Sequence, residues 1–117
     1  MYWDWKLREY AEQGNLAKVK ECLANGADAN DGGALCNASE NGHFEIVKYL
    51  VANGANANAR DWLGKTALMY ASEKGHFEMV KYLVKNGADV NVGNCGKTAI
   101  DVAKNYEVRA FLEKNKN

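Results

Sequence analysis

The chain has 117 residues, of which 47% are hydrophobic, so it is long enough for one domain with a single continuous core. Its 15 basic and 15 acidic residues cancel, which argues against nucleic acid or an anionic membrane as the partner. The apolar runs are far shorter than the roughly 20 residues that span a bilayer, and residues 1 to 12 mix charges with aromatics, so neither a transmembrane helix nor a secretory signal is expected.

The three cysteines are Cys22, Cys36 and Cys95, and no two of them form a Cys-x-x-Cys pair. An odd number leaves one thiol unpaired under any disulfide scheme. A reducing, intracellular setting is therefore expected, in the cytoplasm, with the nucleus left open.

One segment of the chain occurs twice. Residues Asn41–Asn56 and Lys74–Asp89 are nearly identical and lie 33 residues apart, as the positions of His43 and His76 show. A fixed period of this length is typical of a stacked solenoid, in which each unit covers the hydrophobic face of the next. The repeat predicts four units, at about residues 1–30, 31–58, 59–91 and 92–117.

The first unit has the polar outer face that the end of a stack requires. Lys18 stands where the internal units have the apolar Ile46 and Met79. An aromatic cluster precedes it and is expected to fold back over the apolar edge of the first helix pair, with a binding role as the alternative. This cluster consists of Tyr2, Trp3 and Trp5.

The second unit is shortened. Gly26 and Gly54, which occupy equivalent positions, are 28 residues apart instead of 33, and the loss falls between Asn30 and Ala34. This unit is expected to have almost no hairpin loop. The gap either shapes a recess for a partner or is a neutral loss, since surface loops tolerate deletion.

The third unit predicts two helices. Thr66 is the expected N-cap of the first, which runs to Lys74. The second begins at Phe77 and buries the positions of Val80, Leu83 and Val84. Asn86-Gly87 ends it, because glycine accepts the left-handed conformation after a helix.

The fourth unit begins with a loop and ends with a polar cap. Residues 88–97 are rich in Gly and Asn and predict an extended loop or hairpin. Gly96-Lys97-Thr98 resembles the end of a phosphate-binding loop, but Asn91 stands where that motif needs glycine, so a hairpin end is predicted. In the last helix, polar side chains surround Val108, Phe111 and Leu112.

The motifs of the third unit resemble the ankyrin repeat family. Residues 58–68, Asn-Ala-Arg-Asp-Trp-Leu-Gly-Lys-Thr-Ala-Leu, are similar to its N-x-x-D-x-x-G-x-T-P-L segment, and Gly75-His76 and Gly87-Ala88-Asp89-Val90-Asn91 follow. The resemblance covers essentially the whole chain. It implies an all-α ankyrin-repeat solenoid of helix-turn-helix units joined by β-turn fingers, with the second finger shortened, similar in size to small four-repeat members such as myotrophin.

Two departures from the family pattern affect the loops. Alanine replaces the usual proline, at Ala34, Ala67 and Ala99. The family's histidine, which links neighbouring loops by a hydrogen bond, is replaced by Cys36, Met69 and Asp101. With that bond missing, stability is expected to depend more on helix packing.

The resemblance implies a non-enzymatic, monomeric module that binds a folded protein through finger tips and a concave groove, as scaffold or inhibitor. No cofactor and no metal is expected. By alignment with the family's contact positions, the candidate partner-binding residues are Glu12, Gln13, Glu40, Asn41, Trp62, Leu63, Lys65, Met69, Glu73, Lys74, Asn94, Cys95, Lys97 and Asn105.

Trp62 is the most informative of these residues. A tryptophan at a turn tip has little repeat core to pack into, and aromatic anchors contribute much of the energy of protein interfaces. The missing finger of the preceding unit removes a neighbour, so Trp62 is predicted to be exposed. The alternative is packing against the neighbouring finger.

Other functions rest on the histidines and cysteines. His43 and His76 are interpreted as supports of the turn between helices, since neither has further metal ligands at a fixed spacing. Cys22 is predicted in the core, whereas Cys36 and Cys95 are expected to be more exposed. A regulatory protein that binds a metal or small ligand is one alternative, and an engineered ankyrin binder is another.

Overall fold

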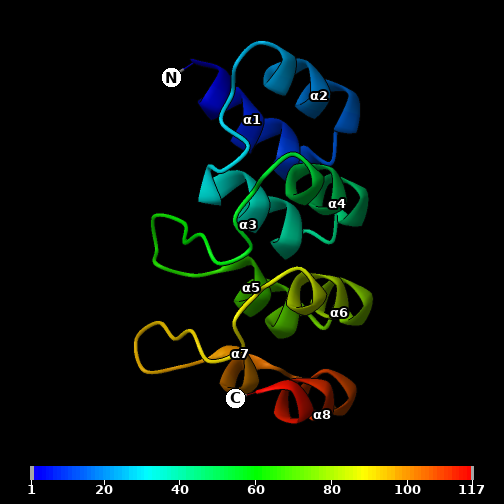
Figure 1. Cartoon of the computed structure of the whole chain (residues 1–117), viewed down its shortest axis with the longest axis vertical. Helices are drawn as coiled ribbons and strands as arrows, with labels where there is room; N and C mark the ends of the chain where they lie inside the picture. Colours follow the sequence, from blue (N-terminus) through cyan, green and yellow to red (C-terminus); the bar gives the residue numbers. More distant parts are fainter. Residues whose placement is uncertain (1, 117) are drawn as a thin grey trace.

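The computed structural model describes residues 2–116, and this part of the chain forms eight α-helices and no extended strand (Figure 1). In chain order they are α1 (Tyr2–Gln13), α2 (Leu16–Ala24), α3 (Gly32–Glu40), α4 (Phe44–Ala52), α5 (Ala67–Lys74), α6 (Phe77–Lys85), α7 (Ala99–Val102) and α8 (Tyr106–Asn115). Each predicted unit contains one helix pair. The four pairs stack along the long axis of a molecule that measures 40 × 24 × 20 Å (Figure 1).

The first helices of the pairs form a closely packed layer, in which α1 contacts α3, α3 contacts α5, and α5 contacts α7. Small side chains make this approach possible, because the distance between packed helices depends on the residues at the contact. Ala34 and Ala38 in α3, like Ala67 and Ala71 in α5, are completely buried. Alanine at the family's proline positions thus belongs to the core.

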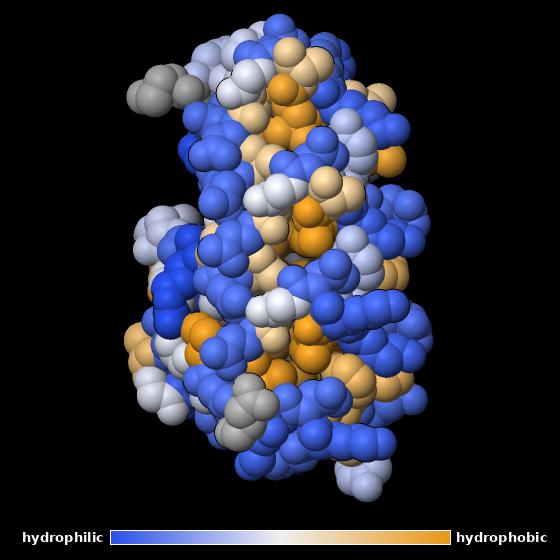
Figure 2. All heavy atoms as spheres, in the orientation of Figure 1, coloured by the Kyte–Doolittle hydropathy of each residue, from blue (hydrophilic) through white to orange (hydrophobic). Residues whose placement is uncertain are grey.

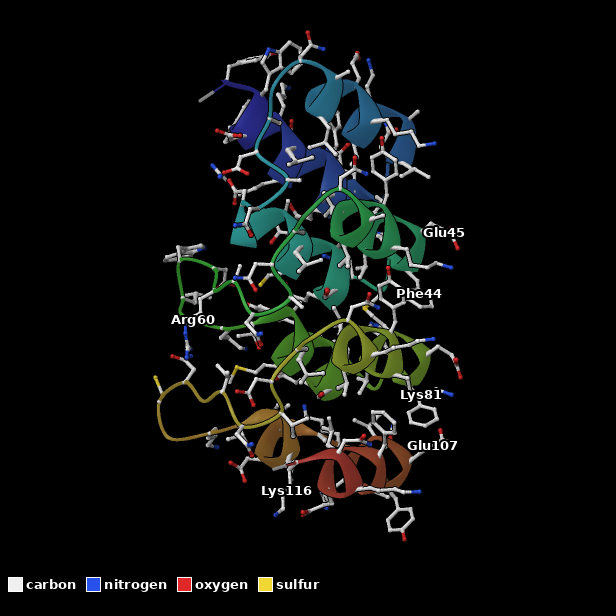
Figure 3. The ribbon with its side chains drawn as sticks, viewed as in Figure 1. Phe44, Glu45, Arg60, Lys81, Glu107 and Lys116 are labelled. Atoms are coloured by element: carbon white, nitrogen blue, oxygen red, sulfur yellow. The ribbon has the colours of Figure 1, made fainter. Side chains whose placement is uncertain are left out.

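The second helices form an outer layer whose aromatic side chains touch from one unit to the next. The rings of Phe44 and Tyr82 meet edge to face at 5.5 Å between centroids, and those of Phe77 and Phe111 at 5.9 Å. On the solvent side of this layer, Lys81 lies 3.0 Å from Glu78 and covers the ring of Phe77 (Figure 3). In Figure 2 the hydrophobic surface is a narrow, interrupted band along the long axis, beside largely hydrophilic residues.

Both histidines support the turn between two helices, as predicted, and the turn that each one contacts belongs to the preceding unit. The ring of His43 lies over Gly14, where an added Cβ would be 2.6 Å from Cε1, and its Nε2 is 3.0 Å from the carbonyl oxygen of Glu12. His76 lies over Gly42 in the same way. Because each histidine occupies the space beside a turn glycine of the previous unit, its role is to set the spacing of the stack.

The helix boundaries predicted for the third unit are confirmed. The Thr66 side chain accepts a hydrogen bond from the Met69 amide at 3.3 Å and caps α5. Asn86 caps the end of α6, and Gly87 follows with a φ of +103°.

Two fingers project from the stack, and the position between the first two helix pairs has none (Figure 1). The fingers are closed by backbone bridges between Arg60 and Thr66 and between Asn94 and Lys97. After α2, the chain runs directly to Asp31, whose side chain accepts from the Gly33 amide and caps α3. The shortened second unit therefore lacks its finger, as the spacing predicted.

The aromatic residues at the N-terminus do not fold back over the first helix pair, so that expectation is wrong. They form the first turns of α1 itself, since nothing in residues 2–13 breaks a helix. Trp3 packs against the core, but Tyr2 and Trp5 are more than half exposed. Only Trp3 covers apolar surface, and Trp5 is available for other contacts.

Candidate functional site

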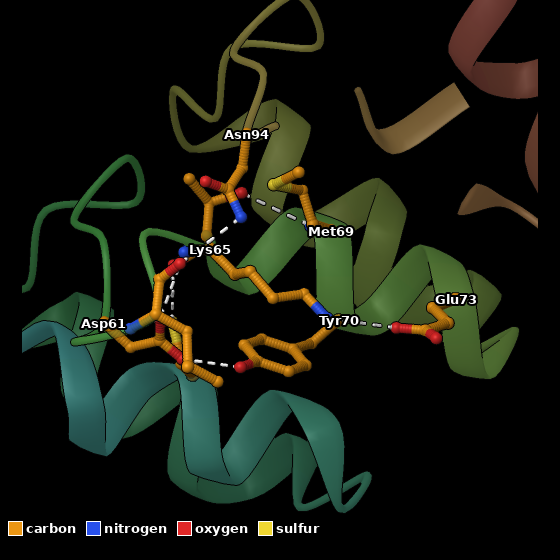
Figure 4. A network of polar contacts seen from close by, with 9 residues as sticks. Asp61, Lys65, Met69, Tyr70, Glu73 and Asn94 are labelled. Atoms are coloured by element: carbon orange, nitrogen blue, oxygen red, sulfur yellow. Dashed lines mark hydrogen bonds and ion pairs between the residues drawn. The ribbon is translucent and has the colours of Figure 1, made fainter. Parts of the chain in front are cut away.

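The finger that carries Trp62 is held from inside by Asp61 (Figure 4). One carboxylate oxygen of Asp61 accepts from the amides of Leu63 and Lys65, both at 3.0 Å, and the other accepts from the Tyr70 hydroxyl at 2.5 Å. This arrangement closes the turn over Trp62 and Leu63 and ties it to α5. Burial of the phenol and its bond to Asp61 raise the pKa of Tyr70, so the hydroxyl stays protonated and keeps donating at neutral pH.

A second set of bonds ties this finger to the next one. The guanidinium of Arg60 donates to the carbonyl oxygens of Gly64, at 2.7 Å, and Gly93, at 2.9 Å (Figure 3). The Asn94 side chain donates to the carbonyl oxygen of Leu63 at 3.3 Å. The finger is therefore a preformed structure, although the family's histidine bond between loops is missing.

Trp62 projects from this braced finger into solvent. Its side chain is 90% exposed and that of Leu63 is 51% exposed, so the prediction of an exposed tryptophan is confirmed. Two other predicted contact residues, Lys65 and Glu73, form an ion pair with each other. Lys65 lies 3.4 Å from Glu73 and covers the ring of Tyr70 at 4.5 Å (Figure 4).

The other predicted contact residues fall into two groups. Most lie on the surface in the order expected along the stack, either exposed or partly exposed: Glu12, Gln13, Glu40, Asn41, Lys74, Asn94, Cys95, Lys97 and Asn105. Met69 does not. It is only 2% exposed, so its assignment to the partner surface is corrected to a packing residue.

Cys36 is buried, contrary to the expectation that it would be more exposed. It is 1% exposed, and its thiol donates to the carbonyl oxygen of Lys65 at 3.4 Å. At this position the thiol links α3 to the following finger and replaces part of the missing histidine bond. Burial raises the pKa of Cys36 to about 12. Cys22 is buried in the core, and Cys95 is exposed, as predicted for both.

The difference in burial among the three cysteines predicts how fast each thiol reacts. In the native protein at neutral pH, Cys95 is expected to react quickly with a chromogenic disulfide reagent, because the thiolate is the reactive form and must be accessible. Cys22 and Cys36 are expected to react only after unfolding. Counting the released chromophore with and without denaturant tests this, and Cys95→Ser should remove the fast phase. Two fast thiols in the native protein would contradict the burial of Cys36.

A recess opens beside Trp62, where the second finger is missing. It lies between α1 and the Trp62 finger and is floored by α3, from which Gly33 and Asn37 contribute. Its volume is about 300 Å³. The side chains around it are Trp5, Arg8, Glu9, Glu12, Asp61 and Trp62. We call it the Trp5–Trp62 notch.

Of the residues around this notch, the sequence analysis identified Glu12 and Trp62 as contact residues, gave Trp5 a binding role only as the alternative, and missed Arg8 and Glu9 on α1. A signal for them was present. Trp5, Arg8, Glu9 and Glu12 follow the spacing of one helical face, on the side of α1 away from the buried Leu7 and Ala11. That the Trp62 finger lies opposite this face of α1 cannot be predicted from the spacing of residues in the sequence.

In residues 2–116, no group of three or more His, Cys, Asp and Glu side chains is placed to hold a metal ion. None of the helices in this range is long and apolar enough to cross a membrane.

The stacked helix pairs, the turn glycines with their histidines and the projecting fingers define an all-α repeat solenoid that presents a row of surface residues. The family model described as ankyrin repeats (3 copies) matches residues 7–94. The chain therefore belongs to the ankyrin repeat family, and the predicted fold is confirmed. A comparison with curated proteins finds no significant match. Ankyrin repeats are generally protein–protein interaction modules without enzymatic activity.

Proposed function

We propose that this protein binds a folded protein partner through the finger tips and the exposed side of the first helices. The observation that carries the proposal is Trp62, a 90% exposed tryptophan at the tip of a finger with a full set of internal hydrogen bonds. A large aromatic side chain that stays in water does not stabilise the folded monomer by burial, whereas such side chains contribute strongly to the binding energy of interfaces.

The rigidity of the finger supports this role. A surface that is already ordered loses little conformational entropy on binding, so more of the contact energy appears as affinity. The surface residues proposed for the interface run along the stack from Glu12 and Gln13, through the Trp62 finger, to Lys97 and Asn105. An interface of standard size would bury about 1,200 to 2,000 Å² in total.

The protein acts in this proposal without catalysis, as a scaffold or as an inhibitor that covers its target. It works inside the cell and as a monomer when free. The three unpaired cysteines support the intracellular setting, because oxidising compartments favour their pairing.

Replacing Trp62 with alanine is expected to weaken partner binding at least tenfold, or by about 1.4 kcal/mol, while the melting temperature changes little. The control is Tyr106→Ala, since Tyr106 is an 85% exposed aromatic residue at the start of α8, far from the finger. Pull-down from cell lysate with mass spectrometry identifies a partner that wild type and the control retain. Titration calorimetry with that purified partner then measures the three affinities.

Loss of stability equal to the loss of affinity would make Trp62 a packing residue. Equal affinity in all three proteins would place the interface elsewhere, and the proposed surface would then be wrong.

A further inference from the structure

We propose that the Trp5–Trp62 notch receives an arginine side chain of the partner. This rests on the proposed function and specifies the chemistry that the partner must present: a protruding basic segment with an arginine at its tip. Three properties of the notch support it, namely its opening, its aromatic walls and its charge.

The notch is open because no finger stands between the first two helix pairs. Where a finger would stand, the chain has Gly32 and Gly33 at the start of α3. A Cβ on Gly33 would lie 2.5 Å from Cδ of Arg8, so the glycine lets the Arg8 side chain lie close against the start of α3, at the edge of the depression between α1 and the Trp62 finger. A volume of about 300 Å³ is at the lower end for small-molecule pockets and suits one long side chain.

The walls are two exposed indoles on separate elements. Trp5 is 52% exposed on α1 and Trp62 is 90% exposed on the finger, and both line the notch. Tryptophan faces attract cations, and the planar guanidinium of arginine stacks on them better than an ammonium does. The Trp5 ring already forms one cation–π contact, because Nζ of Lys6 lies 5.0 Å from its centroid.

The charge of the notch is negative once its internal pairs are counted. Arg8 is neutralised by Asp31 at 2.5 Å, and Glu9 is paired with Lys6 at 3.1 Å. Within residues 2–116 the carboxylate of Glu12 forms no ion pair, and that of Asp61 accepts hydrogen bonds from uncharged donors, namely two backbone amides and the Tyr70 hydroxyl.

The remaining cation nearby offsets only one of these two carboxylates, so the notch keeps a net negative charge. Arg60, at the adjoining edge, directs its guanidinium to carbonyl oxygens of its own finger and the next one (Figure 3). A neutral acceptor is also present, because Asn37 donates its amide to the carbonyl of Arg8 and keeps its side-chain oxygen free for a donor. A guanidinium would thus find two indole side chains, two carboxylates that form no ion pair within residues 2–116, and an amide oxygen.

The test uses the full chain and N-acetyl-arginine amide as the probe. In NMR titrations, the indole N–H signals of Trp5 and Trp62 are expected to shift saturably, with affinity in the millimolar range, while that of Trp3, packed against the core, stays in place. N-acetyl-citrulline amide has the same shape without the charge and is expected to bind at least fivefold more weakly. N-acetyl-lysine amide should be intermediate.

Variants locate the effect. Glu12→Gln should weaken binding of the arginine probe at least threefold, whereas Glu107→Gln, an exposed carboxylate at the start of α8, should not change it. Unshifted indoles, equal binding of the citrulline probe, or no effect of Glu12→Gln would each overturn the proposal.

Failure of the arginine proposal can be distinguished from failure of the proposed function. If Trp62→Ala weakens the captured partner while Glu12→Gln leaves its affinity unchanged at low and high salt, the surface is the interface but the notch does not hold an arginine. If Trp62→Ala leaves the partner's affinity unchanged, the proposed function fails, and the probe titration still decides whether the notch binds a guanidinium.

Discussion

Replacing Leu83 with alanine is expected to lower the free energy of unfolding by about 2 to 5 kcal/mol. Leu83 is completely buried in α6, where it contributes to the contact between the layers of the solenoid. The substitution removes buried methyl groups and leaves a cavity, because the two neighbouring units hold the helix in place. For a chain of this size the loss is a large part of the total stability. Urea denaturation followed by circular dichroism measures it.

The matched control is Lys85→Ala, two residues further along the same helix and exposed. It tests whether alanine itself disturbs α6, and it is expected to change the free energy of unfolding by no more than about 0.5 kcal/mol. A Leu83→Ala protein as stable as this control would show that the core of the third unit is packed differently from the structure described here.

Gly32→Ala is expected to have the second largest effect, a loss of about 1 to 3 kcal/mol in the free energy of unfolding. A Cβ at this position would lie 2.4 Å from the backbone carbonyl oxygen of Arg60, an approach that real side chains do not make. Since the clash is with the backbone of the finger, either α3 or the finger must move. The change should also alter the tryptophan fluorescence, because Trp62 stands on that finger.

Gly33→Ala is the control, one residue further in the same helical turn. Its Cβ would meet Cδ of Arg8, a side chain that is 40% exposed and can move aside. Alanine also favours a helix by about 1 kcal/mol over glycine, so the net change is expected to be within about 1 kcal/mol. If both variants lose the same stability, the cost arises from α3 itself and the close approach of the finger is not its cause.

Much of the fold was predictable because the signals are local and repeated. The second helix of each internal unit, the capping role of Thr66 and the stop at Gly87 follow from spacing and from the properties of single residues. The missing finger followed from a count of residues between equivalent glycines. The ankyrin repeat resemblance combined these signals, and the family match confirms it.

Met69 and Cys36 show where such reasoning fails. Both stand at the family's histidine position near the fingers, which made them look accessible from the sequence alone. In the structure Met69 is only 2% exposed, and the Cys36 thiol donates a hydrogen bond to the backbone carbonyl oxygen of Lys65. Whether a residue at this position is covered depends on the path of the next loop, which the residue's own unit does not specify.

The sequence by itself determined the architecture of this protein and the exposure of Trp62, because a period of 33 residues, helix caps and a shortened loop act within a unit or between neighbours. Only the tertiary structure decided that Trp5 and Trp62 line one notch. They are far apart in the chain and belong to different units. Two features bring them together. The second finger, which would stand between them, is absent, and the close packing of α1 on α3 sets the distance from the face of α1 that carries Trp5 to the finger that carries Trp62.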